Sequence, residues 1–128
     1  LETMVKTIVS IVISAALLFF ISIFERFRVN EIFYGFRERL VALYEKTEDN
    51  EATYCDGESV RTFWTEKRKE LHVWVTHTSI ENVDFQLNEA IGYLYEEKFE
   101  DALPKIEVLI EMTKKIPASY AFRFENVF

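Results

Sequence analysis

Residues 7–24 read TIVSIVISAALLFFISIF and contain no charged side chain. At about 1.5 Å per residue, a helix of that length reaches roughly 27 Å, close to the hydrocarbon thickness of a bilayer. Such a helix satisfies its own backbone hydrogen bonds in lipid. A run without a polar face suits neither a soluble surface nor the core helix of a small domain. We therefore predict a transmembrane anchor at 7–24, preceded by a short N-terminal tail at 1–6.

A cleaved signal peptide is the competing interpretation of this run. The run is longer than the usual apolar region of a signal peptide, and ISIFERF offers bulky side chains where a signal peptidase needs small ones. We expect an uncleaved signal anchor that holds a helical soluble domain, residues 25–128. The flanking charges do not fix the orientation, because Lys6 precedes the run while Arg26 and Arg28 follow it.

The soluble part shows apolar residues at helical spacing in four stretches. The first, Val29 to Tyr44, can continue the membrane helix directly. Loop residues in TEDNEATYCDG separate it from a second helix, which should begin near Asp56 or Ser59. Ser79 is the expected N-cap of the third. Because the connections are short, we predict an all-α fold, a small antiparallel bundle of about four helices behind the N-terminal transmembrane helix.

Two prolines frame the fourth helix. Pro104 suits the first turn of a helix that begins near Asp101, and Pro117 is expected to end it because proline lacks a backbone N–H. In SYAFRFENVF, which follows, aromatic residues recur at every second position, the period of an extended chain. We predict an extended aromatic C-terminal tail across the bundle, with a docking segment for another protein as the alternative.

The stretch LHVWVTHTSIENV is the most suggestive of a chemical site. His72 and His77 are five residues apart, so they point to different sides of a helix. His77 and Glu81 have a spacing that can share a helix face, but we expect the helix to break between them. We interpret His77 as the end of the second helix, where its ring can bond to a free carbonyl, and Trp74 as a core anchor just before it.

The remaining composition argues against several functions. Residues 1–24 hold one acid and one base, so the whole net charge of −7 falls on the soluble part, and an acidic domain does not attract nucleic acid. Cys55 is the single cysteine, so no disulfide can form within the chain; we expect a free thiol, with an intermolecular partner as the alternative. No spacing recommends it, or a serine, as a nucleophile beside a histidine. We expect no enzymatic activity, and no catalytic, cofactor or metal site.

The run FWTEKRKELHVWVTHTSIENVDFQLNEAIGYLYEEKFEDAL and the terminal ENVF resemble the bacterial family labelled domain of unknown function 4363. The family's two tryptophans, histidine, isoleucine and chain ending match Trp64, Trp74, His77, Ile80, Asn126 and Phe128. Val127 stands where the family has isoleucine, and Thr78 and Ser79 stand where acids are expected after the histidine. The resemblance implies a membrane-anchored protein of Gram-positive, often spore-forming, bacteria with its domain outside the cytoplasm. It implies no activity.

These observations favour a non-enzymatic interaction or accessory module of the bacterial cell envelope. Its expected partners are the lipid bilayer, through residues 7–24, and another membrane or envelope protein. The alternative is an extracytoplasmic ligand-binding or sensor domain, with an aromatic pocket between helices, motivated by the aromatic content of 16%. The residues singled out for structural or interaction roles are Trp64, Trp74, His77, Ser79, Asn126 and Phe128.

Overall fold

The computed structural model describes residues 1–71 and 75–127, with residues 120–127 described by their backbone alone. Four α-helices and one 3-10 turn follow in order: α1 (Glu2–Glu48), α2 (Tyr54–Lys67), η1 (Arg68–Glu70), α3 (His77–Tyr95) and α4 (Phe99–Val127). The described residues form no strand. The all-α prediction is confirmed.

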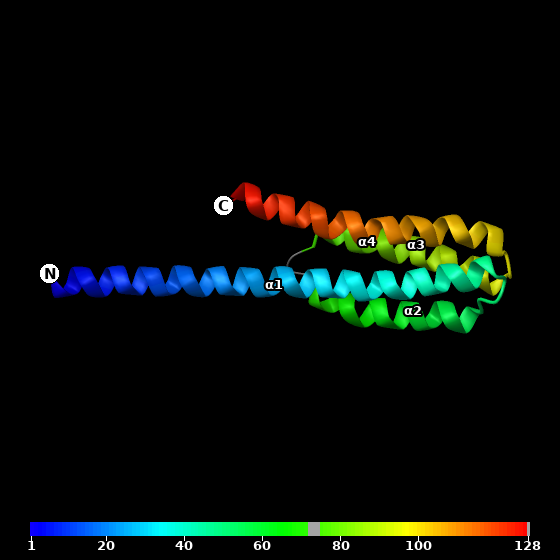
Figure 1. Ribbon diagram of the computed structural model, residues 1–128, viewed down its shortest axis with the longest axis horizontal. Helices are drawn as coiled ribbons and strands as arrows, with labels where there is room; N and C mark the ends of the chain where they lie inside the picture. Colours follow the sequence, from blue (N-terminus) through cyan, green and yellow to red (C-terminus); the bar gives the residue numbers. More distant parts are fainter. Residues whose placement is uncertain (72–74, 128) are drawn as a thin grey trace.

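The helices alternate in direction and form an antiparallel four-helix bundle, as predicted (Figure 1). α1 packs against α2 and α4, and α3 packs against the same two helices from the other side. Most of the N-terminal half of α1 projects alone from one end, beyond the C-terminal turns of α4 (Figure 1). We call that end of the bundle the near end. The far end is the opposite one, where the α1–α2 and α3–α4 turns lie.

One uninterrupted helix carries both the apolar run and the first wall of the bundle, as predicted. The apolar half of α1 is long and apolar enough to cross a membrane, and none of its most apolar window is buried. Phe20, for example, is 68% exposed. The burial pattern changes at Val29, the first buried residue of α1. From there onward α1 presents a buried stripe at helical spacing, which is the pattern of a helix packed on a core.

Aromatic side chains from α1 and α2 fill the middle of the bundle. Phe33, Phe36 and Trp64 are almost fully buried. The ring centroids of Phe36 and Trp64 lie 4.8 Å apart, and those of Phe33 and Trp64 lie 5.9 Å apart. Rings at these separations attract each other beyond the gain from burial alone. Aliphatic residues complete the core: Leu40, Leu71, Ile80, Leu87, Ile91, Leu94, Ile106 and Leu109.

At the far end, α1 and α3 end in the same kind of turn. Asn50 and Glu97 both have a φ of 57°, in the left-handed region. The chain then folds back, so that the Glu51 N–H donates to the Lys46 carbonyl at 2.8 Å, and the Lys98 N–H donates to the Tyr93 carbonyl at the same distance. These bonds satisfy carbonyls that the end of a helix leaves without an intrahelical partner.

α2 begins earlier than predicted, because Thr53, rather than Asp56 or Ser59, is its N-cap. The Thr53 hydroxyl accepts from the Asp56 N–H, and the Asp56 carboxylate accepts from the Thr53 N–H, which together form a capping box. Asp56 is thus the third residue of the helix. Cys55 lies in the first turn of α2 and is exposed.

The corner between α2 and α3 also differs from the prediction. α2 ends at Lys67, and α3 begins at His77, so His77 opens a helix instead of ending one. Thr76 is the N-cap, and Ser79, predicted for that role, is the third residue of α3 and donates its backbone N–H to the Thr76 hydroxyl. Both hydroxyl residues suit a cap, and the extended backbone of Thr76 places the helix start there.

α4 corrects the prediction of an extended tail, because it continues through Pro117 to Val127. It also begins at Phe99, two residues before Asp101, which leaves Pro104 beyond the first turn. Pro104 is exposed, so water can solvate the carbonyl that its ring leaves unbonded. Pro117 is buried, and its freed carbonyl needs a partner from the protein.

Candidate functional site: a basic pocket at the near end

Arg37 of α1 provides the hydrogen-bond donor for the carbonyl that Pro117 leaves without an intrahelical partner. In a regular helix the N–H of residue 117 would donate to the carbonyl of Thr113, but proline has no N–H. The Arg37 Nη2 group donates to this carbonyl at 3.1 Å, and its Nε donates to the Thr113 hydroxyl at 3.0 Å. A side chain 76 positions away thus supplies the missing donor. This explains why α4 continues past Pro117, and it fixes the position of the Arg37 guanidinium.

A surface pocket opens beside this contact, between α1 and α4. Its lining residues are Arg26, Asn30, Tyr34 and Arg37 from α1, and Lys114, Pro117 and Ala118 from α4. Three of these are cationic and none is acidic, although the chain as a whole has a net charge of −7. We call this feature the basic pocket.

Two further polar contacts join other elements of the bundle toward the near end. Arg28 donates through Nη2 to both carboxylate oxygens of Glu70, at 2.9 and 3.1 Å. The hydrogen bond and charge of Glu70 raise the pKa of the Arg28 guanidinium above its ordinary value, with a smaller contribution from Glu31. This contact joins α1 to η1 outside the apolar run, at the point where the bundle begins.

The second contact involves Trp64, whose indole Nε1 donates to Asp84 Oδ1 at 2.7 Å. The other oxygen of Asp84 accepts from Arg68 in a close ion pair. One carboxylate of α3 therefore pairs both the buried indole of α2 and the guanidinium of η1. A carboxylate that accepts from both groups holds the corner together.

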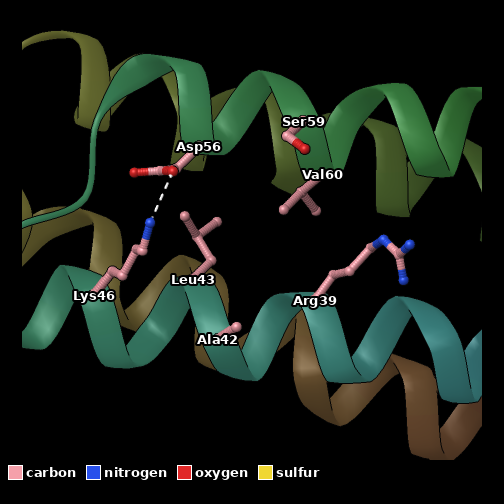
Figure 2. A pocket seen from close by; sticks show the side chains of 7 residues that line it. All are labelled: Arg39, Ala42, Leu43, Lys46, Asp56, Ser59 and Val60. Atoms are coloured by element: carbon pink, nitrogen blue, oxygen red, sulfur yellow. Dashed lines mark hydrogen bonds and ion pairs between the residues drawn. The ribbon is translucent and has the colours of Figure 1, made fainter.

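A second pocket lies between α1 and α2, toward the far end (Figure 2). Lys46 reaches across it to Asp56, with Nζ and Oδ1 3.1 Å apart. The pKa of Asp56 is lowered, chiefly by the hydrogen bond from the Thr53 backbone and also by Lys46. Arg39 lines the same pocket and stacks its guanidinium 4.0 Å from the centre of the Phe63 ring. The polar groups here cap α2 and join it to α1.

The residues singled out from the sequence lie in different environments in the structure. Trp64 is buried and hydrogen-bonded, as befits a core anchor. His77 Nε2 and Glu81 Oε1 lie 2.9 Å apart on the exposed first turns of α3, so no break separates them, contrary to the prediction. Trp74 and Phe128 lie outside the described residues, as does the side chain of Asn126. The described residues bring no three His, Cys, Asp or Glu side chains together in a way that could hold a metal ion.

Sequence reasoning missed the basic pocket because its cations are scattered. Arg26, Arg37 and Lys114 belong to no cluster along the chain, and only the packing of α4 on α1 brings them to one surface. A weak signal was present in Pro117. A proline that follows 18 residues of helical pattern in α4 raises the question of what replaces its N–H, and a facing arginine is one answer.

The architecture defines a class: a small four-helix bundle domain carried on an apolar N-terminal helix. Within this class, the chain belongs to the family described as Domain of unknown function (DUF4363), whose pattern matches residues 29–127. The match begins at the first buried residue of α1 and ends at the last residue of α4, so it coincides with the bundle. No curated protein and no solved structure matches the chain.

Proposed function

We propose that this chain is a non-enzymatic, single-pass membrane protein of the bacterial cell envelope, whose bundle acts as an interaction or accessory module for another envelope protein. The observation that carries the proposal is the continuity of α1, in which a fully exposed apolar half passes without interruption into the core of the bundle. Exposed apolar surface of that extent is unfavourable in water and favourable in lipid.

The polar side chains that make well-defined hydrogen bonds and ion pairs support a non-enzymatic role. Asp84 pairs with Trp64 and Arg68, Asp56 caps α2, and Arg37 completes α4. Each group has a structural partner that accounts for its position. His77 with Glu81 is an exposed pair at a helix start, and neither side chain faces a described pocket.

Exposed aromatic residues support an interaction surface on the bundle. Phe85 of α3 is 62% exposed, and Tyr54 and Tyr95 form an exposed edge-to-face pair at the far end, with ring centroids 5.3 Å apart. Aromatic side chains are enriched where proteins bind one another. A photo-crosslinking residue at position 85 should give a discrete adduct in intact membranes, whereas the same residue at Glu107, which is exposed on α4, should give none. Adducts of equal yield at both positions would argue against a specific surface at Phe85.

The membrane anchor and its orientation can be tested in one experiment. We expect the full chain to stay in the pellet after alkaline carbonate washing and to be released only by detergent. Because Cys55 is exposed and is the single cysteine, a membrane-impermeant thiol reagent should label it in intact cells if the bundle is outside. Cys55→Ser is the control for background labelling. Release by carbonate would refute the anchor, and labelling only after lysis would refute the external orientation.

A ligand-binding or sensor domain with an aromatic pocket is the second candidate. It receives less support, because Phe33, Phe36 and Trp64 pack against one another and Tyr34 is the one aromatic residue that lines either of the two bundle pockets described above. A rise in melting temperature with a small metabolite or a metal ion would favour this candidate. An enzyme that uses His77 would be indicated if His77→Ala, at normal abundance, abolished cellular function.

A further inference from the structure

We propose that the C-terminal segment of α4, residues 118–127, lies in the interfacial layer of the bilayer that surrounds the apolar half of α1. The segment is then a second membrane contact, added to the proposed anchor on which this inference rests. Its partner is a lipid surface. The chemistry that suits this surface is that of aromatic side chains held at the border between hydrocarbon and water.

A contact within the bundle sets the level of this segment along α1. Arg37 donates to the carbonyl of Thr113, and α1 and α4 run in opposite directions. Counting toward the near end from this contact places position 122 about level with Arg28, and position 124 about level with Arg26. The last turns of α4 therefore lie beside the residues that directly follow the apolar run.

Burial along α1 indicates the same level independently. Every residue of α1 up to Ile21 is exposed, and Ser22 is the first half-buried one, two residues before the apolar run ends. Another part of the chain therefore begins to cover α1 inside the run. Among the described helices α4 reaches this far, since its last turns extend along α1 beyond the ends of α2 and α3 (Figure 1).

α2 and α3 stop short of this level. Arg28 pairs with Glu70, the last residue of η1, so the chain that follows α2 has reached only Arg28 when η1 ends. Lys105 of α4 pairs with Glu89 of α3, and counting from this pair places the first residue of α3 level with Pro117. Beyond Pro117, α1 is the one described helix that packs beside α4.

The level of the segment coincides with the polar layer of a bilayer, which extends roughly 5–7 Å outside the hydrocarbon on each side. Phe124 and Phe122 lie level with the second and fourth residues beyond the apolar run, about 3 and 6 Å outside it. α1 places two more aromatic residues at this level, because Phe24 and Phe27 are 64% and 67% exposed. Phenylalanines from two helices thus gather at the height of the interface.

The sequence of the segment suits lipid better than water. Phe122 and Phe124 are two positions apart, about 200° around a helix, and one neighbouring helix covers only one side of α4. At least one of these positions therefore lies on a side that α1 does not cover. The segment also holds one base and one acid, Arg123 and Glu125, so it has no net charge, whereas the chain as a whole carries −7. An anionic lipid surface thus does not repel it.

Spin labels on single cysteines of the full chain, in liposomes of phosphatidylglycerol and phosphatidylcholine, test the proposal. Cys55→Ser removes the one native thiol. Labels are then placed at Phe122→Cys, at Asn126→Cys, which keeps both phenylalanines, and at Val108→Cys, an exposed position of α4 within the bundle. Each label reports collisions with oxygen, which dissolves in lipid, and with a charged nickel complex, which stays in water.

We expect the ratio of oxygen to nickel collisions to rise along α4 toward the near end. It should be at least about fivefold higher at Asn126→Cys than at Val108→Cys, because transfer of a charged complex out of water is strongly unfavourable. Phe122→Cys, one turn further from the hydrocarbon, should give an intermediate value. No rise along this series would overturn the proposal. Low collision rates with both reagents at positions 122 and 126 would also overturn it, since a second copy or another protein would then cover the segment.

A fourth label, at Phe20→Cys inside the apolar run, separates this result from the proposed anchor. Phe20 is 68% exposed, so its label should collide with oxygen and not with nickel if the run is in lipid. A lipid-exposed label at position 20 with water-exposed labels at 122 and 126 would contradict the second contact alone. A water-exposed label at position 20 would contradict the anchor and the second contact together.

Discussion

At the far end of the bundle, the turns and caps are held by contacts between close neighbours in the sequence, whereas at the near end, besides the local cap of α3, polar contacts join segments that are distant in the sequence. The capping box links Thr53 and Asp56, three residues apart, and Lys46 reaches Asp56 over ten. At the near end, Arg28 reaches Glu70 over 42 positions, and Arg37 reaches Thr113 over 76. Both ends must satisfy the backbone groups of their helices, but they use different partners to do so.

The difference follows from what each end must connect. The far end holds two short turns, which local residues can close by themselves. At the near end α3 has its own local cap at Thr76, but α1 continues outward and α4 passes a buried proline, so residues distant in the sequence supply the contacts that join these helices to the bundle. We therefore expect substitutions at the near end to cost more stability than substitutions at the far end, and four measurements test this comparison.

The largest effect is expected from Asp84→Ala. The substitution leaves the buried indole N–H of Trp64 without an acceptor and removes the partner of Arg68. The free energy of unfolding of the detergent-solubilised chain, measured by urea titration, should fall by about 2–3 kcal/mol. Asp84→Asn keeps an acceptor for the indole and should cost clearly less. Equal losses for the two variants would show that the indole bond is not the main contribution.

Arg37→Ala should lower the free energy of unfolding by about 1–2 kcal/mol, because the Thr113 carbonyl loses its donor. Pro117→Ala restores a backbone N–H that can donate to this carbonyl. Arg37→Ala should therefore cost less in the Pro117→Ala background, and a double-mutant cycle measures the coupling. Strictly additive losses would contradict our explanation of why α4 continues past the proline.

At the far end, Glu97→Gly should increase the free energy of unfolding by about 0.5–1 kcal/mol. Glu97 adopts a left-handed backbone conformation that glycine tolerates without a steric cost. Asn50→Gly is the matched substitution in the α1–α2 turn and should gain less, because asparagine is already tolerated in this region. A larger gain at Asn50 than at Glu97 would contradict the expectation.

The smallest effect is a dependence on pH at the capping box. The pKa of Asp56 is lowered in the folded chain, so its contribution to stability is complete above the ordinary pKa of aspartate, about 4. The contribution is lost as the pH falls through the lower folded-state pKa. Urea midpoints of the wild-type chain and Asp56→Asn should therefore differ most at neutral pH and converge in acid. A difference that is constant with pH would contradict this assignment.

The contrast between local contacts and contacts that join distant segments also explains which features could be predicted from the sequence. The continuity of α1 and the loop in TEDNEATYCDG depend on local sequence, and both were predicted from it. The path of α4 beyond Pro117 depends on Arg37, far away in the chain, so a local rule that stops helices at proline gave the wrong result. Thr76 and Ser79 are both good caps, and periodicity alone does not choose between them.

The basic pocket was unpredictable for the same reason. Its three cations come from the middle of α1 (Arg26), the last third of α1 (Arg37) and the middle of α4 (Lys114). Nothing in their spacing marks them as neighbours until α4 is packed against α1. Asp84 is a similar case, since its two partners belong to α2 and η1 while it lies on α3.

The unbroken length of α1 also fixes a rotational phase between its two halves. No glycine, proline or loop interrupts the helix between the apolar run and Val29, so rotation of the apolar half about its axis turns the bundle with it. One residue inserted between Glu25 and Arg28 would rotate the bundle by about 100° relative to the apolar half and move it by about 1.5 Å. The direction in which α3 faces, relative to the apolar half of α1, is thus encoded in the number of residues between the apolar run and Val29.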